Sequence, residues 1–175
     1  MKQNVIAETE VEGQPIFVEE LLYGDKISAR YAAVIPTQET GIQDGFYTRM
    51  SGIPSYAVRR GVGGSVIGVL DTKNFTPKDG VNSAVLTMVT VSTAHIEPSS
   101  PYKNIKGVGS LLLDAFCSDL DSHGIRGYLN PCSMDTNKLT TPQLVEWYKR
   151  RGFQYHTDFS AVTNDMPYVL QRLGR

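Results

Sequence analysis

The sequence predicts an α/β (α+β) fold, in which helices flank a mixed, mostly antiparallel central sheet that holds one parallel strand pair. The first observation is the order of strand-like run, glycine-rich turn, amphipathic helix and strand over residues 84–129, which is typical of a parallel crossover. The second is a pair of short β-type runs around residues 60–64, which predicts a hairpin. The third is a closing antiparallel pair around a turn at residues 163–165.

Length and composition are those of one globular domain spanning residues 1–175. The 175 residues are 41% apolar and 20% charged, which is too apolar for a disordered chain. A formal net charge of −1 provides no field that would draw the chain onto nucleic acid, so nucleic acid is not an expected partner. No run approaches the roughly 18 apolar residues of a membrane span and no signal-peptide core opens the chain, so a cytoplasmic location without membrane contact is expected.

Two helices are expected near the N-terminus, after a first strand at residues 5–10. Residues 15–24 are predicted to form a helix that the proline opens and the glycine ends. Its apolar face would consist of Phe17, Val18, Leu21 and Leu22. A second helix is expected over residues 25–35, before a proline. The glycine-rich stretch 37–54 has no sustained period and is interpreted as a long surface loop, which is either functional or a disordered excursion.

The middle of the chain carries strand signals. Short β-type runs at residues 56–59 and 65–70 flank a glycine-rich turn and predict a hairpin. Residues 84–96 are rich in Val and Thr and are expected to form one long strand with a bulge. Residues 126–129 predict the strand that lies parallel to it.

The helix at residues 108–123 has the clearest pattern. Its apolar residues recur with a period of about 3.6, and they are Leu111, Leu112, Ala115, Phe116 and Leu120. Gly124 stands where a left-handed C-cap belongs. The helix follows directly on a turn that contains Gly107 and Gly109, so its first N–H groups and its partial positive charge face whatever the turn binds.

That turn has the composition of a phosphate-binding loop, because glycines let the backbone approach a ligand and a helix N-terminus favours an anion. A dinucleotide fingerprint requires a third glycine where Leu112 stands. A Walker loop requires Lys and then Ser or Thr after Gly109, where Ser110 and Leu111 stand instead. Both motifs are excluded. A strand-to-helix turn that needs glycine only for its backbone stays open.

A second well-marked helix precedes the closing strands. Thr141 can cap it and Pro142 can occupy its first position, while Gly152 ends it. One face is expected to hold Leu144, Val145 and Tyr148. Residues 153–159 and 166–173 then predict the closing antiparallel pair.

The cysteines and histidines predict no metal site. Cys117 and Cys132 form no CxxC pair and are expected to be reduced thiols. His95, His123 and His156 lack metal-ligand spacing, so no metal cofactor is expected.

Two segments resemble the GNAT superfamily of acyl-CoA N-acyltransferases. Residues 104–112, NIKGVGSLL, are similar to its pyrophosphate loop, Gln/Arg-x-x-Gly-x-Gly/Ala, except that Asn104 stands where Gln or Arg is usual. Residues 144–153, LVEWYKRRGF, are similar to its Tyr-x-x-x-Gly-Phe motif. The matching residues there are Tyr148, Gly152 and Phe153.

The resemblance covers residues 55–173, leaves residues 1–54 unmatched, and implies a GNAT-like sheet in which the parallel strands splay apart. It implies acetyl-CoA as a co-substrate. The pyrophosphate would lie on the loop residues Asn104, Ile105, Lys106, Gly107, Val108, Gly109 and Ser110. Pantetheine would bond to the backbone of His95 and Ile96, with a position near Val91 as the alternative.

The resemblance also places Tyr148 beside the CoA sulfur, where a phenol with an ordinary pKa of about 10 would protonate the departing thiolate. Packing against Leu144 is the alternative role for this side chain. Glu97 is the candidate general base and His95 the second candidate. Neither belongs to a family motif, and an ordinary exposed side chain stays open for both.

These assignments predict an N-acetyltransferase that moves an acetyl group from acetyl-CoA to a primary amine by direct attack in a ternary complex. The partners are therefore an acyl-CoA and an amine acceptor, which could be a small molecule or a protein, and a homodimer stays open. Two alternatives remain: a domain of the same fold that binds CoA or a partner without turnover, and a nucleotide-binding module that uses the glycine turn for another phosphate.

Overall fold

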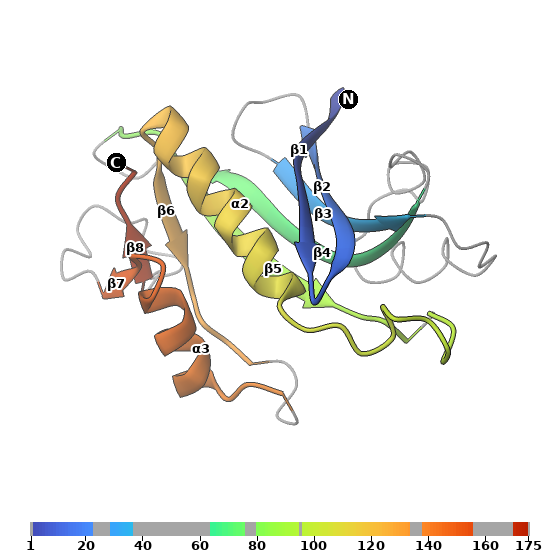
Figure 1. Cartoon of the computed structure of the whole chain (residues 1–175). Helices are drawn as coiled ribbons and strands as arrows, with labels where there is room; N and C mark the ends of the chain where they lie inside the picture. The colour runs from blue at the N-terminus through green and yellow to red at the C-terminus, as the bar shows by residue number, and fades with distance from the viewer. Residues whose placement is uncertain are drawn as a thin grey trace. The chain divides into compact units, whose positions relative to one another are not determined.

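The computed structural model describes residues 2–22, 29–36, 64–75, 80–94, 96–133, 138–155 and 170–174. Its strands are β1 (Lys2–Val11), β2 (Gln14–Leu22), β3 (Ala29–Pro36), β4 (Gly64–Phe75), β5 (Ser83–Val91), β6 (Arg126–Leu129), β7 (Gln154–Tyr155) and β8 (Leu170–Arg172). Its described helices are α2 (Val108–His123) and α3 (Thr141–Lys149), and Figure 1 shows these elements. Neither of these two helices has the length and apolar character that a membrane span requires.

The strands form one sheet in the order β1-β2-β3-β4-β5-β6-β8-β7. The pairs β1–β2, β2–β3, β3–β4, β6–β8 and β7–β8 are antiparallel, whereas β5–β6 is parallel. This mixed, mostly antiparallel sheet with one parallel pair confirms the predicted fold class.

The chain divides into two compact units. The first consists of Met1–Asp71 and Met88–Ala115, and the second of Thr72–Thr87 and Phe116–Arg175. The strands β4 and β5 and the helix α2 therefore each contribute one part to either unit. The expectation of a single domain stays a prediction.

The N-terminal helix predicted at residues 15–24 is wrong, because residues 14–22 form β2. This strand pairs on one side with β1 and on the other with β3. Its alternate residues Ile16 and Val18 are fully buried, while Phe17 between them is partly buried. A two-sided hydrogen-bonded ladder with alternating burial thus overrides the helix-like spacing of the apolar residues.

The helix predicted at residues 25–35 is also wrong, because residues 29–36 form β3; residues 23–28 lie outside the described part. From Tyr31 to Ile35 every side chain is at most 4% exposed, so both faces of β3 are covered. One core cluster of the first unit consists of Ala32, Val34, Val66 and Val69, with Phe17 packed against it. A strand buried on both faces lacks the alternation that identifies strands in a sequence.

The strand predicted at residues 84–96 is shorter than expected, because β5 ends at Val91. Of the predicted hairpin, residues 65–70 lie in β4, while residues 56–59 and the turn up to residue 63 lie outside the described residues. The predicted loop at residues 37–54 also lies outside them.

The parallel crossover that the sequence predicted has its paired strand residues in the second unit. Its first strand pairs with β6 through Ser83↔Arg126, Ala84↔Gly127 and Val85↔Tyr128. The helix α2 has the predicted bounds, and Gly124 follows it with a φ of 62°. A Cβ on Gly127 would lie 2.5 Å from Leu120 Cδ1, so the glycine lets α2 pack closely on β6.

The end of the second unit follows the prediction with one shift. The N-cap of α3 is Thr140 rather than Thr141, and its backbone N–H donates to Gln143 Oε1 at 2.8 Å. Gly152, with a φ of 84°, follows the helix as predicted. The closing pair is confirmed where β7 and β8 are described, through Gln154↔Gln171 and Tyr155↔Leu170. The turn predicted at residues 163–165 lies outside the described residues.

Candidate functional site

The predicted phosphate loop lies in the first unit and opens α2. Gly107 has a φ of 87°, a left-handed conformation that favours glycine, and its carbonyl accepts the N–H of Leu111 at 3.0 Å. Gly107 is therefore the residue that precedes the first helical turn, in which the N–H groups have no intrahelical partner. The positive end of the helix dipole and these N–H groups together suit an anion.

Two apolar side chains anchor the loop while its polar residues face solvent. Ile105 and Val108 are buried, at 7% and 1% exposure, whereas Asn104, Lys106 and Gly107 are exposed. Gly109 and Ser110 are partly buried. All seven predicted pyrophosphate residues thus lie in one continuous segment, with Ile105 and Val108 inside and the rest at or near the surface.

A close approach between β4 and α2 fixes the position of this loop within the first unit. A Cβ on Gly68 would lie 2.8 Å from Val108 Cγ1 and 3.0 Å from Leu112 Cδ1. Only glycine leaves room for the first turns of the helix at this point of the strand. An isolated glycine in an otherwise apolar strand-like run is the local signal for such a close approach.

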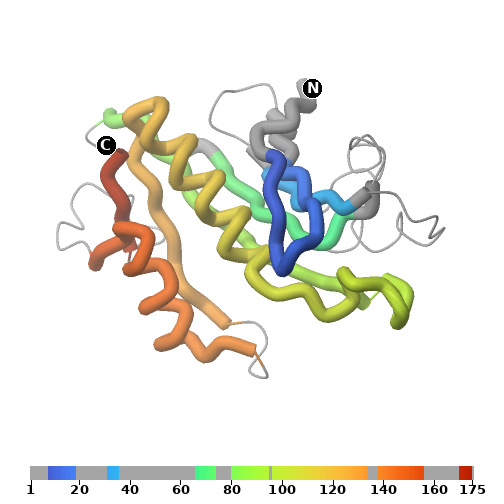
Figure 2. Tube along the Cα trace, viewed as in Figure 1, coloured from blue at the N-terminus to red at the C-terminus, as the bar shows by residue number. Residues whose placement is uncertain are grey.

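The connection between β5 and the loop is held by Lys103, which the sequence analysis missed. Figure 2 traces this connection from the end of β5 into α2. The Lys103 ammonium donates to the carbonyls of Thr93, Ala94 and Ile96, at 3.2, 3.0 and 2.8 Å. The Thr93 hydroxyl donates in return to the Lys103 carbonyl. No residue pattern in the sequence predicts a contact between a lysine side chain and backbone carbonyls.

The predicted pantetheine position, His95 and Ile96, does not lie in a strand of the described residues, because β5 ends at Val91. Ile96 lies five residues beyond the end of β5, its side chain is buried, and its carbonyl accepts the bond from Lys103. His95 lies outside the described residues. The alternative position, Val91, is the last residue of β5. The roles of His95 and Ile96 stay predictions, although an extended backbone at the site now favours Val91.

Tyr148 lies in the second unit, on the buried face of α3. Its side chain is 6% exposed, and its ring contacts Trp147 and Phe153 at centroid distances of 4.8 and 5.8 Å. Burial raises the pKa of the phenol to about 12. Among the described residues the hydroxyl has no hydrogen-bond partner. A buried hydroxyl without a partner is costly and suits a ligand atom that accepts its proton in a hydrogen bond.

The raised pKa defines what this hydroxyl can do. A thiol has an ordinary pKa of about 8.5, so complete transfer of a proton from a phenol of pKa about 12 to a free thiolate is unfavourable. Donation of a hydrogen bond to a sulfur that gains negative charge is favourable as long as the phenol keeps its proton. Tyr148 is therefore suited to stabilise a leaving thiolate and unsuited to act as a base.

The same pKa predicts that Tyr148→Phe makes the protein more resistant to alkali. The phenol has a pKa of about 10 in the unfolded chain and about 12 in the folded one, so its titration leaves the free energy of unfolding unchanged below pH 10 and lowers it as the pH rises toward 12. At pH 11 the loss is about 1.4 kcal/mol. The melting temperature of the variant should therefore fall less between pH 9 and 11 than that of the parent. An equal fall in both proteins would contradict the buried, neutral phenol.

The other predicted catalytic residue, Glu97, lies in the turn after β5. Its side chain is exposed, and its carbonyl accepts the N–H of Ser100 at 3.0 Å. Its role as a base stays a prediction. No group of three or more His, Cys, Asp or Glu side chains that could hold a metal ion occurs within the described ranges.

Comparisons by sequence identify no relative: no family model matches the chain, and no curated protein matches it. A crystal structure of the anti-CRISPR protein AcrVA5 is similar over 60% of this chain and 88% of its own, at 17% identity and a TM-score of 0.40. A structure of Arabidopsis thaliana Naa50 in complex with the bisubstrate analogue CoA-Ac-MVNAL is similar over 81% and 97%, at 16% identity and a TM-score of 0.38. Similarities this loose establish neither a family nor a function for this chain.

Proposed function

We propose that this chain is an acetyl-CoA-dependent N-acyltransferase that acetylates a primary amine. The observation that carries the proposal is Gly107 in a left-handed conformation at the start of α2, within a segment that matches a pyrophosphate loop at all but one position. This arrangement exposes N–H groups and the positive end of a helix dipole to an anion. In the proposal, the pyrophosphate of acetyl-CoA binds residues 104–110.

The second support is Tyr148, whose buried hydroxyl has no hydrogen-bond partner within the described part of the chain. In the proposed reaction the neutral amine nitrogen attacks the thioester carbon, a C–N bond forms, and the C–S bond breaks. The amine releases one proton, and the sulfur takes up one to become the CoA thiol. Tyr148 donates a hydrogen bond to the sulfur as the charge develops there, and pantetheine lies along the end of β5 near Val91.

The test of the proposal is whether acetyl-CoA raises the melting temperature. A ligand that binds only the folded state at 100 times its Kd stabilises it by about 2.7 kcal/mol, which corresponds to a shift of roughly 5–10 °C for a chain of this length. Gly109→Val should abolish the shift, because a branched side chain crowds the backbone that approaches the phosphates. Gly109→Ala is the matched control and should keep it, since the loop pattern accepts Ala at this position.

Two results would contradict the proposal. If millimolar acetyl-CoA produces no shift, the chain is not an acyl-CoA protein. If nucleotides at the same concentration raise the melting temperature as much as acetyl-CoA does, the loop is a general phosphate site. Release of free thiol with a panel of amines then distinguishes an enzyme from a domain that binds CoA without turnover. The second possibility is considered because Asn104 stands where the loop pattern has Gln or Arg.

A further inference from the structure

The tip of the β1–β2 hairpin contacts the phosphate loop within the first unit, and Figures 1 and 2 both show it beside the start of α2. The Glu12 carboxylate accepts the backbone N–H of Lys106 at 3.4 Å. The Tyr102 hydroxyl donates to the Pro15 carbonyl at 3.0 Å. Val11 Cγ1 lies 3.5 Å from the position that a Cβ on Gly107 would take. The hairpin thus meets the segment on both sides of Lys106.

The turn itself is costly for the residue that occupies it. Glu12 and Gly13 have φ values of 53° and 76°, so both central positions of this two-residue turn are left-handed. Such turns strongly favour Asn, Asp or Gly at the first position, and a side chain like that of Glu disfavours this conformation. A residue persists in an unfavourable backbone conformation when its surroundings hold it there, and such residues are often functional. The contact that Glu12 makes from this conformation is the hydrogen bond that its carboxylate accepts from the Lys106 N–H.

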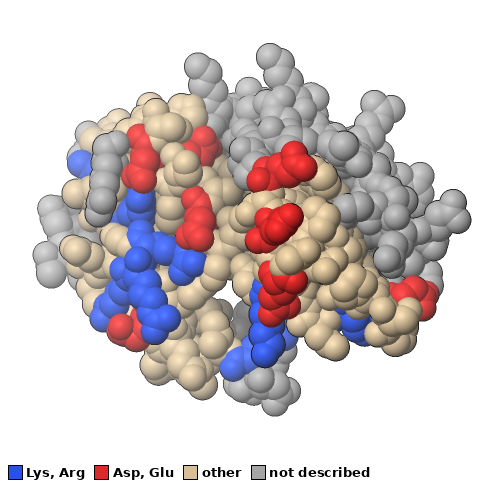
Figure 3. Space-filling view, viewed as in Figure 1, with Lys and Arg blue, Asp and Glu red and all other residues tan. Residues whose placement is uncertain are grey.

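The contact is between an anion and the amide next to Gly107. A carboxylate oxygen and a phosphate oxygen offer the same acceptor to a backbone N–H, and both are favoured near the positive end of a helix. Glu8, Glu10 and Glu12 are all exposed at alternate positions of one hairpin strand and its turn. In Figure 3 red side chains follow the place that β1 has in Figure 1, with blue side chains at its lower end. Only Glu12 of the three hydrogen-bonds the loop among the described residues.

We propose that Glu12 is a built-in competitor of the acyl-CoA pyrophosphate, an autoinhibitory contact that holds the Lys106 amide until the ligand displaces it. This inference rests on the proposed function for the identity of the ligand, while the competition with an anion is a property of the hairpin itself. Binding of the pyrophosphate brings two further negative charges to the same backbone, and the carboxylate then has to leave.

The test compares Glu12→Gln with Glu10→Gln. Glutamine keeps the length and an acceptor oxygen but removes the charge, and Glu10 is another exposed glutamate two residues away. Binding is measured for acetyl-CoA by calorimetry and for inorganic pyrophosphate by the shift of the Lys106 amide in NMR spectra. We expect Glu12→Gln to bind both about fivefold more tightly than the parent, a typical effect of one charge at a helix terminus. Glu10→Gln should change binding by less than about twofold, because its charge acts through solvent.

The outcomes separate this inference from the proposed function. If acetyl-CoA binds the parent and Glu12→Gln equally, the competition is overturned and the proposed function stands. If pyrophosphate binds more tightly to Glu12→Gln while acetyl-CoA binds neither protein, the competition stands and the proposed function falls. If Glu10→Gln gives the same gain, the effect is a general field and the contact is overturned. Weaker binding by Glu12→Gln would likewise overturn it, since Glu12 would then support the loop.

Discussion

Replacing Tyr148 with phenylalanine should lower kcat for acetyl transfer about 100-fold and leave the KM for acetyl-CoA nearly unchanged. The hydroxyl is buried, which raises its pKa to about 12, and it has no hydrogen-bond partner among the described residues. In the proposed reaction the hydrogen bond from this hydroxyl to the sulfur strengthens as the C–S bond breaks. Loss of the hydroxyl should therefore raise the activation free energy by about 2.7 kcal/mol. Steady-state kinetics with one amine found by screening measure both constants.

The control for this substitution is Tyr155→Phe, which removes the hydroxyl of a tyrosine that is 54% exposed in the same unit. It should leave kcat unchanged. At neutral pH Tyr148→Phe should melt no lower than the parent, because a hydroxyl without a partner contributes little to stability. Equal kcat values would remove Tyr148 from the mechanism. A rise in KM with an unchanged kcat would instead assign it to binding of CoA.

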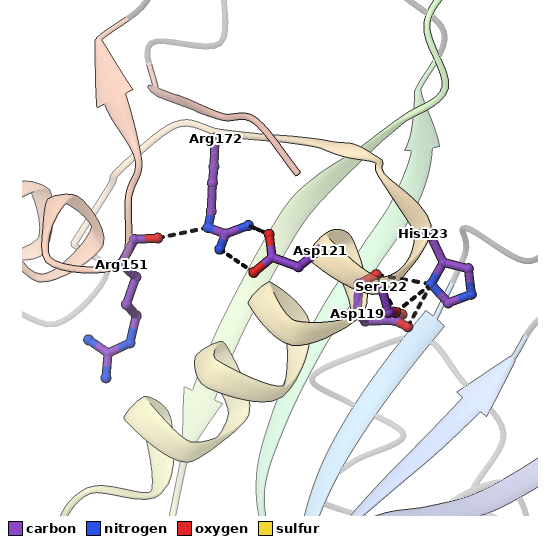
Figure 4. A network of polar contacts seen from close by, with 6 residues as sticks. All are labelled: Asp119, Asp121, Ser122, His123, Arg151 and Arg172. Carbon is purple, nitrogen blue, oxygen red and sulfur yellow. Dashed lines mark hydrogen bonds and ion pairs between the residues drawn. The ribbon is translucent and has the colours of Figure 1, made fainter. Parts of the chain in front are cut away.

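Replacing Arg172 with methionine should lower the free energy of unfolding by about 3 kcal/mol. Figure 4 shows why: Arg172 Nη1 and Nη2 donate to the two oxygens of Asp121 at 2.6 and 2.7 Å, and Nε donates to the Arg151 carbonyl at 2.8 Å. The hydrogen bond to Asp121 raises the pKa of the guanidinium, so the pair stays charged. One side chain thus joins the end of α2, the strand β8 and the segment after α3.

The two partners of this ion pair should not be equally costly to remove. Arg172 is 8% exposed, whereas the Asp121 side chain is 34% exposed. Asp121→Asn leaves a buried cation and should therefore destabilise more than Arg172→Met, which leaves an anion that water can reach. Arg172→Lys should rescue little, because an ammonium cannot make the two parallel bonds. Denaturant unfolding measures all three variants.

An exposed ion pair of the same unit serves as the control. Lys149 Nζ lies 3.0 Å from Glu146 Oε1, with side chains 39% and 62% exposed. Lys149→Met should cost less than about 1 kcal/mol. If Arg172→Met costs no more than this control, the Asp121 pair does not hold the second unit together.

The sequence was most informative where one local signal sufficed. The stripe from Leu111 to Leu120 and Gly124 gave α2 its bounds, because both the period and the cap are written in adjacent residues. The loop before α2 was identifiable for the same reason. The cap of α3 was off by one residue, since two consecutive threonines could fill that position and only the contact with Gln143 selects Thr140.

The sequence misled where pairing partners lie far away. β2 has apolar residues at helical spacing, and β3 is apolar from Tyr31 onward, with alanines that favour a helix. Both became strands because each has a neighbour on either edge, a fact no local window contains. One local signal was available: Glu12-Gly13 between two β-compatible runs is a plausible two-residue turn. The contact of that turn with Lys106, 94 positions along the chain, had no signal at all.

The Lys103 contact has an evolutionary consequence. Its three acceptors are main-chain carbonyls, which every residue type supplies, so the identities of residues 93, 94 and 96 are not what this side chain recognises. Residue 94 contributes only backbone groups to these contacts, whereas Thr93 also donates through its hydroxyl and Ile96 is buried, so Lys103 leaves some positions of the connection unconstrained and not others. A homologue that keeps these side chains can differ at the exposed positions 94, 97–99 and 101 and still present the loop in the same way, so this part of the segment can diverge in sequence faster than in shape.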